Sequence, residues 1–214
     1  MIEIDGLRYS GSGTIVRQAA VFSALTGRPI HVVNARAHRP RPGLRAQHIK
    51  VLQAIAQLVS GETEGVRLGS REFVFRPGAR DEGQSYTWDI GSAGSTSLLA
   101  LAVLPILAFG PRRVSVELQG GLFQDFAPSV LHLQHVMLPL LKQMGLEVGL
   151  EMLRPGYVPR GGGRLCLSVD PLRDRLQPLV LDQSSTVERL WGIALASHLE
   201  ERKVSHRMAA ATRS

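Results

Sequence analysis

The sequence predicts an α/β (α+β) fold built from two βαβαββ units in tandem, followed by a short ββα segment. Hydrophobic residues make up 44% of the 214 residues and charged residues 20%, which provides enough apolar surface for packed cores. The order of predicted strands and helices repeats with a period of roughly 85 residues, which indicates duplication of a whole unit. Each unit is expected to form a sheet backed by helices.

The first unit begins with a short strand and a glycine turn that leads into a helix. Alternating apolar residues indicate its strands, and apolar residues three or four apart indicate its helices. Prolines in the loop "ARAHRPRPG" interrupt the chain before the second helix. The elements are expected at 2–4 (strand), 13–25 (helix), 29–34 (strand), 44–59 (helix), 65–68 (strand) and 72–75 (strand).

The second unit repeats this order. Glycine and serine residues form its first turn, and the loop "QGGLFQDFAPS" precedes its second helix. The elements are expected at 86–90 (strand), 95–108 (helix), 113–118 (strand), 130–144 (helix), 147–153 (strand) and 164–169 (strand).

The pattern changes beyond Pro171. Strands are predicted at 179–182 and 187–196 and a helix at 200–211. A ββα segment of this size has too little apolar surface to fold alone, so it is expected to be the opening of a further element. The sequence therefore predicts three parts: residues 1–80, 81–172 and 173–214.

The charge of the chain comes mainly from arginine. The formal net charge is +7, the pI is about 10.5, and the lysines are Lys50, Lys142 and Lys203. Arginine grips phosphate with two parallel hydrogen bonds, which favours a polyanionic partner such as a nucleotide or nucleic acid. A GC-rich genome would also enrich arginine, so the position of each arginine matters more than their number.

The sequence predicts a soluble, cytoplasmic protein without a membrane partner. Cys166 is the single cysteine, so no intramolecular disulfide can form. The longest apolar stretch, 98–109, is too short to span a membrane and contains Pro105. No signal peptide is expected before "MIEIDG".

Two segments of the first unit predict phosphate binding. In "IDGLRYSGSGTIVRQ" a glycine turn opens a helix whose first N–H groups can bind phosphate, with Arg17 one turn further on. In "ARAHRPRPGLRAQH" the arginines repel one another unless an anion lies between them. This second segment contains Arg36, Arg39, Arg41, Arg45, Gln47 and His48. The structural alternatives are an ordinary strand–helix turn, a solvated basic loop, and a capping role for His48.

The second unit offers weaker signals. The segments "DIGSAGSTSL", "APSVLHLQHVMLP" and "RPGYVPRGGG" are rich in turn residues, and the glycines at 161–163 could admit a ligand or form a plain turn. His132 and His135 lie three residues apart on a predicted helix, but no third ligand is near in the sequence. No zinc site and no P-loop are predicted.

Taken together, these segments resemble the RNA 3'-terminal phosphate cyclase family. The resemblance covers nearly the whole chain, through "IDG…GSG.IVR", "LTGRPI", "RPRPGLRAQH", "DIGSAGS", "APS" and "GYVPRGGG" in the family's order. It implies βαβαββ units similar to the carboxy-terminal domain of translation initiation factor three. It also implies that the segment after Pro171 is the start of a small α/β insert.

The resemblance implies a reaction that uses ATP and a divalent metal, Mg or Mn. In the family a histidine attacks the α-phosphate of ATP and forms a covalent enzyme–AMP. AMP then passes to an RNA 3'-phosphate. The neighbouring 2'-hydroxyl closes a 2',3'-cyclic phosphodiester, and AMP leaves.

Carried over to this sequence, the family positions that contact phosphates are Arg17, Arg36, Arg39, Gln47 and His48. Three family positions are changed: the metal-binding glutamate falls on Ser10, a glutamine on Thr14, and another glutamine on about Leu101. Neither serine nor leucine can replace a carboxylate or an amide that orients a triphosphate. The family's nucleophilic histidine is expected beyond residue 214, so no catalytic residue is assigned here.

Three functions stay open at this stage. The first is an ATP-dependent cyclase of RNA 3'-phosphate ends that is incomplete in this chain. Its missing unit is lost or is supplied by a second chain, or the sheet edges left exposed without it are covered by self-association. The second is a non-catalytic, cyclase-like RNA-binding protein of the ribosome-biogenesis type. The third is a small-molecule transferase with the same repeated design, such as the enolpyruvyl transferases.

Overall fold

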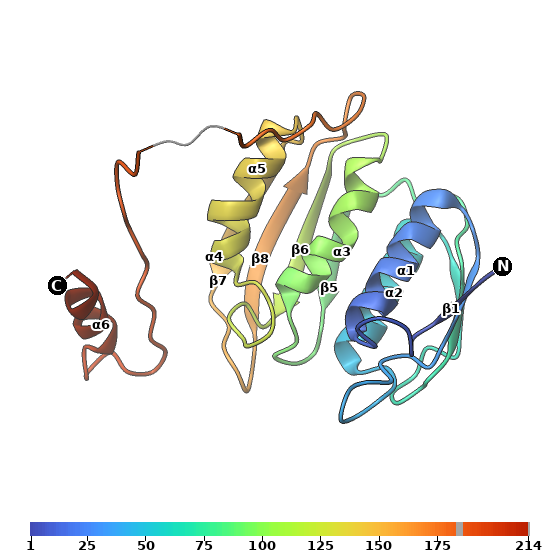
Figure 1. The fold of residues 1–214 in the computed structure, drawn as a ribbon, viewed down its shortest axis with the longest axis horizontal. Coiled ribbons are helices and arrows are strands. Elements are labelled where there is room, and N and C mark those ends of the chain that lie inside the picture. Colours follow the sequence, from blue (N-terminus) through green and yellow to red (C-terminus); the bar gives the residue numbers. More distant parts are fainter. Residues whose placement is uncertain (183–185, 214) are drawn as a thin grey trace. The chain divides into compact units, whose positions relative to one another are not determined.

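The computed structural model describes residues 1–182 and 186–213 (Figure 1). The chain divides into two compact units, Met1–Leu179 and Val180–Ser214. The first contains two four-stranded mixed sheets and their helices, which confirms the predicted α/β (α+β) class.

The first sheet has the strand order β1–β2–β4–β3. Its elements are β1 (Ile2–Asp5), α1 (Gly13–Thr26), β2 (Ile30–Val33), α2 (Ala46–Leu58), β3 (Glu62–Glu64) and β4 (Phe73–Arg76). β1 and β2 are parallel, whereas β4 is antiparallel to both β2 and β3. The strand predicted at 65–68 is wrong: the strand lies at 62–64, and it ends because Gly65 and Gly69 adopt left-handed φ values of 72° and 77°.

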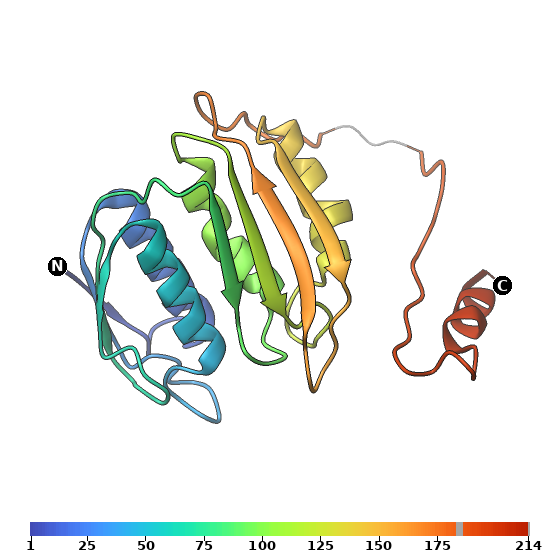
Figure 2. The ribbon, with the colours of Figure 1, turned by 180° about the vertical axis from the view of Figure 1, so that it is seen from behind.

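The second sheet repeats this topology with the order β5–β6–β8–β7. Its elements are β5 (Ser85–Asp89), α3 (Thr96–Ala108), β6 (Val114–Gly120), α4 (Val130–His132), η1 (Leu133–Met137), α5 (Leu138–Gln143), β7 (Val148–Arg154) and β8 (Gly163–Val169). The helix predicted at 130–144 is present, but η1 inserts π-helical backbone between α4 and α5. In Figure 2 the strands of this sheet lie in front of its helices.

The helices of the two sheets pack against one another. α1 contacts α2 and α3, and α2 also contacts α3, so the three form a shared layer between the sheets (Figure 1). The fully buried side chains of this layer include Val16, Ile55 and Leu99. Apolar burial of this kind contributes about 25 cal/mol per Å² and holds the two halves of Met1–Leu179 together.

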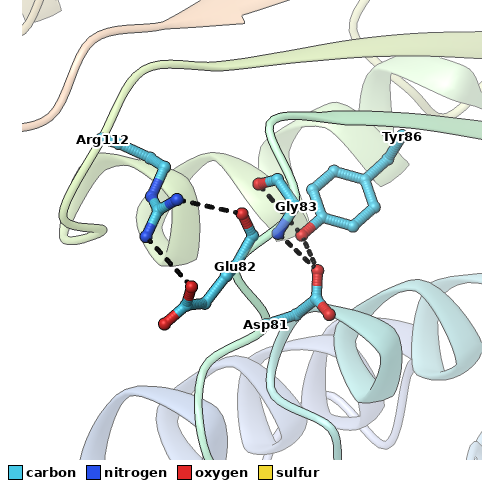
Figure 3. Close-up of polar contacts among 5 residues, drawn as sticks. All are labelled: Asp81, Glu82, Gly83, Tyr86 and Arg112. Atoms are coloured by element: carbon cyan, nitrogen blue, oxygen red, sulfur yellow. Dashed lines mark hydrogen bonds and ion pairs between the residues drawn. The ribbon is translucent and has the colours of Figure 1, made fainter.

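Polar contacts hold the connection between the two sheets. The hydroxyl of Tyr86 donates to the carboxylate of Asp81, and Arg112 donates to the carbonyl oxygen of Glu82 at 3.2 Å (Figure 3). Burial and the Asp81 carboxylate raise the pKa of Tyr86 to about 12, so its hydroxyl stays a donor. Across the two halves, Trp88 Nε1 donates to Gln57 Oε1 at 2.8 Å.

The last segment differs from its prediction. The strands expected at 179–182 and 187–196 do not form, while residues 183–185 lie outside the described part of the chain. A strand needs a hydrogen-bonded neighbour, and among the described residues none pairs with this segment. The predicted helix is confirmed as α6 (Val204–Arg213), which starts four residues later than expected. In the described part of the chain no helix has the length and apolar character needed to cross a membrane.

Replacing Gln57 with Leu is expected to lower the free energy of unfolding by about 1 kcal/mol, because the largely buried indole N–H of Trp88 loses its acceptor. Urea unfolding followed by circular dichroism measures this change. The matched control is Gln53→Leu, an exposed position on the same helix, which should leave stability unchanged. Equal effects of the two substitutions would contradict the assigned role of the Trp88–Gln57 bond.

Candidate functional site

A cavity of about 490 Å³ lies where the amino-terminal ends of α1, α2 and α3 come together. Its lining residues come from these ends, from the basic loop at 36–45 and from the segment before α4. They are Gly13, Thr14, Arg17, Arg36, Arg39, Pro40, Arg41, Arg45, Gln47, His48, Ser95, Leu98, Gln124, Asp125, Phe126 and Ala127. The cavity thus brings together all five residues predicted to contact phosphates.

The start of α1 supplies one side of the cavity. Ser12 caps the helix by accepting a hydrogen bond from the Thr14 N–H at 3.3 Å. One turn later Arg17 is half-buried, and its guanidinium donates to Thr14 Oγ1 at 3.4 Å. Burial lowers the pKa of Arg17 from its usual value, because partial loss of hydration disfavours the charged form.

Arg36 organises the basic loop. Its φ of 58° is left-handed, and its Nη1 donates to the carbonyl oxygens of Arg41 at 2.9 Å and Gly43 at 2.6 Å. Burial, followed by the positive charges of Arg39 and Arg45, lowers the pKa of Arg36. Arg36 therefore folds the loop back on itself, while the side chains of Arg39 and Arg41 stay exposed beside it.

His48 is buried, with 2% of its surface exposed. Its Nδ1 accepts a hydrogen bond from the Arg45 N–H at 3.2 Å, so in the neutral ring Nε2 carries the proton. A Cβ atom at Gly13 would lie only 2.2 Å from Nε2, so the ring fits against α1 because residue 13 is glycine. Burial, followed by the charges of Arg36 and Arg17, lowers the pKa of His48 to about 3. His48 is thus both a capping residue of α2 and a neutral donor beside the cavity.

Gln47 connects the two halves of the cavity. Its Oε1 accepts a long hydrogen bond of 3.4 Å from the N–H of Ser95, the residue that caps α3. On the same side, Gln124 Nε2 donates to the Ala93 carbonyl oxygen at 3.1 Å, while the buried Gln124 Oε1 has no partner in the described residues. The prediction noted the loop "QGGLFQDFAPS" and the segment that begins at Ala127, but missed Gln124, Asp125 and Phe126, because no charge pattern marks them.

The charges of the cavity are strongly unbalanced. Asp125 is the one carboxylate among its lining residues, and in the described chain no ion pair within 4.0 Å joins a carboxylate to the lining arginines. Helix amino termini add partial positive charge at the same place. The arrangement is suited to an anion with several oxygen acceptors, such as a phosphate group.

Comparison with known proteins agrees with this chemistry. A family model described as RNA 3'-terminal phosphate cyclase matches residues 8–213. The chain belongs to the RNA 3'-terminal phosphate cyclase family. A cyclase of Hyperthermus butylicus is 40% identical over 207 residues, and one of Methanopyrus kandleri is 41% identical over 209 residues. A cyclase of Nitrosospira multiformis is 37% identical over 209 residues.

These matches cover 95%, 95% and 98% of this chain, but only 57%, 58% and 58% of the three cyclases. The chain therefore spans less than two thirds of the length of these relatives.

The residues present do not fit the divalent cation that the family resemblance implies. Ser10, which the resemblance predicts to stand in place of a glutamate, shares a hydrogen bond of 2.9 Å with the hydroxyl of Ser12. Neutral hydroxyls are poor substitutes for a carboxylate ligand. In the described residues no group of three or more His, Cys, Asp or Glu side chains could hold a metal. Ser10 therefore offers no carboxylate ligand for a divalent cation.

The low pKa of His48 predicts a specific pH dependence of stability. Unfolding restores the pKa of His48 to its ordinary value near 6.5. Between this value and about 3 the unfolded chain therefore binds a proton at His48, whereas the folded chain does not. The His48 contribution is present above pH 6.5 and is lost as the pH falls from about 6.5 to about 3, by at most about 1.4 kcal/mol per pH unit. His48→Asn, which keeps an acceptor for the Arg45 N–H, should remove this part of the acid destabilisation. Urea unfolding at pH 7, 5.5 and 4 measures it; parallel curves for the two proteins would contradict the prediction.

Gly13→Ala is expected to destabilise the chain by about 1–3 kcal/mol, because the new methyl group overlaps the His48 ring, which is buried and cannot move aside freely. Thermal unfolding measures the change. The neighbouring exposed substitution Thr14→Ala is the control and should have a small effect. A neutral Gly13→Ala variant would show that His48 is not held against α1.

Proposed function

We propose that this chain forms the phosphate-binding part of an ATP-dependent RNA 3'-terminal phosphate cyclase. The complete reaction converts an RNA 3'-phosphate into a 2',3'-cyclic phosphodiester. The observation that carries the proposal is that Arg17, Arg36, Arg39, Gln47 and His48 all line one cavity at three helix amino termini. The family identity supports the reaction type, and the charge of the cavity supports the ligand class.

The residues of the cavity have separable roles in this proposal. Arg17 and Arg39 donate to phosphate oxygens from opposite sides, since one stands on α1 and the other on the basic loop. Arg36 keeps that loop folded through its two carbonyl contacts. The Nε2–H of His48 adds a neutral donor, and bound phosphate should raise the pKa of His48 because a negative charge favours imidazolium.

The same cavity chemistry suits the triphosphate of ATP and the 3'-phosphate of RNA. In the proposal ATP supplies the adenylyl group, and its covalent acceptor is a histidine outside these 214 residues, supplied by further sequence or by a second chain. His48 is unsuited to that role, because the Arg45 N–H occupies the lone pair on its Nδ1 and Nε2 carries the proton. The relatives named above are all cyclases, so the non-catalytic alternative is not favoured.

The chain by itself is expected not to form a covalent AMP adduct. Incubation with α-labelled ATP and Mg or Mn, followed by denaturing electrophoresis, tests this. A labelled band would contradict the expectation, and loss of that band in His48→Asn would then identify His48 as a nucleophile. A full-length cyclase of the family is the positive control.

Arg17→Met and Arg39→Ala are each expected to weaken binding of a 3'-phosphorylated oligoribonucleotide about tenfold or more, because each loses a charge-assisted hydrogen bond. Fluorescence anisotropy measures the affinity. The same RNA with a 3'-hydroxyl should bind more weakly to the unchanged protein and respond less to either substitution. The control is Arg28→Ala, just beyond the carboxy-terminal end of α1 and roughly 20 Å from its amino terminus. If Arg28→Ala weakens binding as much, the cavity is not the phosphate site.

A further inference from the structure

A second cavity, of about 430 Å³, lies in the first βαβαββ unit outside the site described above. It is formed at the end of β2 and by the turn between β3 and β4. Its lining residues are Val33, Asn34, Arg67, Leu68, Gly69, Ser70, Arg71 and Glu72. No aromatic ring is among them, and two of them are arginines.

The segments that line the two cavities are hydrogen-bonded to each other through their backbones. The turn at 67–71 is hydrogen-bonded to the basic loop: the Ala35 N–H donates to the Arg71 carbonyl oxygen at 2.7 Å, and the Leu44 N–H donates to the Ser70 carbonyl oxygen at 2.8 Å. A Cβ atom at Gly43 would lie 2.2 Å from the Gly69 carbonyl oxygen. The loop that carries Arg36 on the first cavity is therefore one layer of chain away from the second.

The arginines of the second cavity have no local partner. Both Arg67 and Arg71 are exposed, and in the described residues neither guanidinium has a hydrogen bond or an ion pair. The exposed carboxylate of Glu72 also lines the cavity and forms no ion pair with either arginine; its Oε2 lies 3.6 Å from His31 Nε2. The positive charges of Arg67 and Arg71 are repelled by those of the first cavity. This electrostatic repulsion is relieved when an anion binds between them.

We propose that Arg67 and Arg71 hold backbone phosphates of the RNA strand that precedes its 3'-terminal phosphate. This inference rests on the proposed function, because it takes the first cavity as the place of the terminal phosphate. A single strand carries a phosphate at every nucleotide, and in this proposal the strand that ends in the first cavity runs past the turn at 67–71. Without an aromatic ring in the lining, the second cavity contacts the backbone rather than stacking with bases, so this contact is independent of RNA sequence.

The test compares the affinities for a short and a long RNA, measured for the unchanged protein and for a variant without the two arginines. In the described residues the guanidinium groups of Arg67 and Arg71 make no hydrogen bond or ion pair, so the variant Arg67→Ala with Arg71→Ala should keep the fold. Its affinity for a 3'-phosphorylated decanucleotide should fall about tenfold or more at low salt, whereas its affinity for a 3'-phosphorylated dinucleotide should not change. The slope of log K against log salt for the decanucleotide should become shallower by about 1.4, since about 0.7 is expected per phosphate contact on a single strand.

Two further variants complete the experiment. Arg67→Lys with Arg71→Lys should keep the salt slope, because the charges remain. Arg28→Ala with Arg113→Ala removes the same amount of positive charge at other positions. It should leave the dependence of affinity on RNA length unchanged. Equal losses for dinucleotide and decanucleotide, or no loss for either, would overturn the inference. If the unchanged protein binds RNA equally with and without a 3'-phosphate while Arg67 and Arg71 still determine decanucleotide affinity, the proposed function fails, and only the RNA-backbone contact of the two arginines is kept.

Discussion

The convergence of three helix amino termini is the constraint on which the rest of the site depends. Packing α1, α2 and α3 in one layer directs their positive ends to a single cavity, and the basic loop adds arginines there. Such a cluster opposes folding through mutual repulsion. The apolar helix layer supplies the opposing free energy, while the neutral His48 fills the space between α1 and α2 without adding a charge.

The way in which this charge is held differs from residue to residue. Arg36 is tied to its own loop by two carbonyl oxygens, whereas Arg39 is exposed beside it. Arg17 is half-buried on α1 and makes one long contact to Thr14. The cavity therefore combines a hydrogen-bonded loop with exposed arginine side chains at its edge.

Much of the architecture could be predicted from the sequence, because apolar periodicity determines the helices and most strands of both sheets. The strand expected at 65–68 was misplaced, because its apolar residues Val66 and Leu68 lie in a turn that two glycines form with left-handed φ angles. The π-helical η1 has no signal in apolar spacing, and the strands expected after Pro171 need a partner that local sequence cannot reveal. The arginines and His48 were found from their types and spacing. Residues 124–126 and the second cavity arise only from tertiary contacts between distant loops.

The loops that face each other across the first cavity occupy equivalent places in the two repeats. The loop between β2 and α2 is rich in arginine, whereas its counterpart between β6 and α4 contributes Gln124, Asp125, Phe126 and Ala127. The duplicated units have thus diverged into complementary partners, one cationic and one nearly neutral. The walls of the cavity come from both copies of the repeat, although the predicted phosphate-contacting residues all lie in the first, so the two repeats are no longer interchangeable.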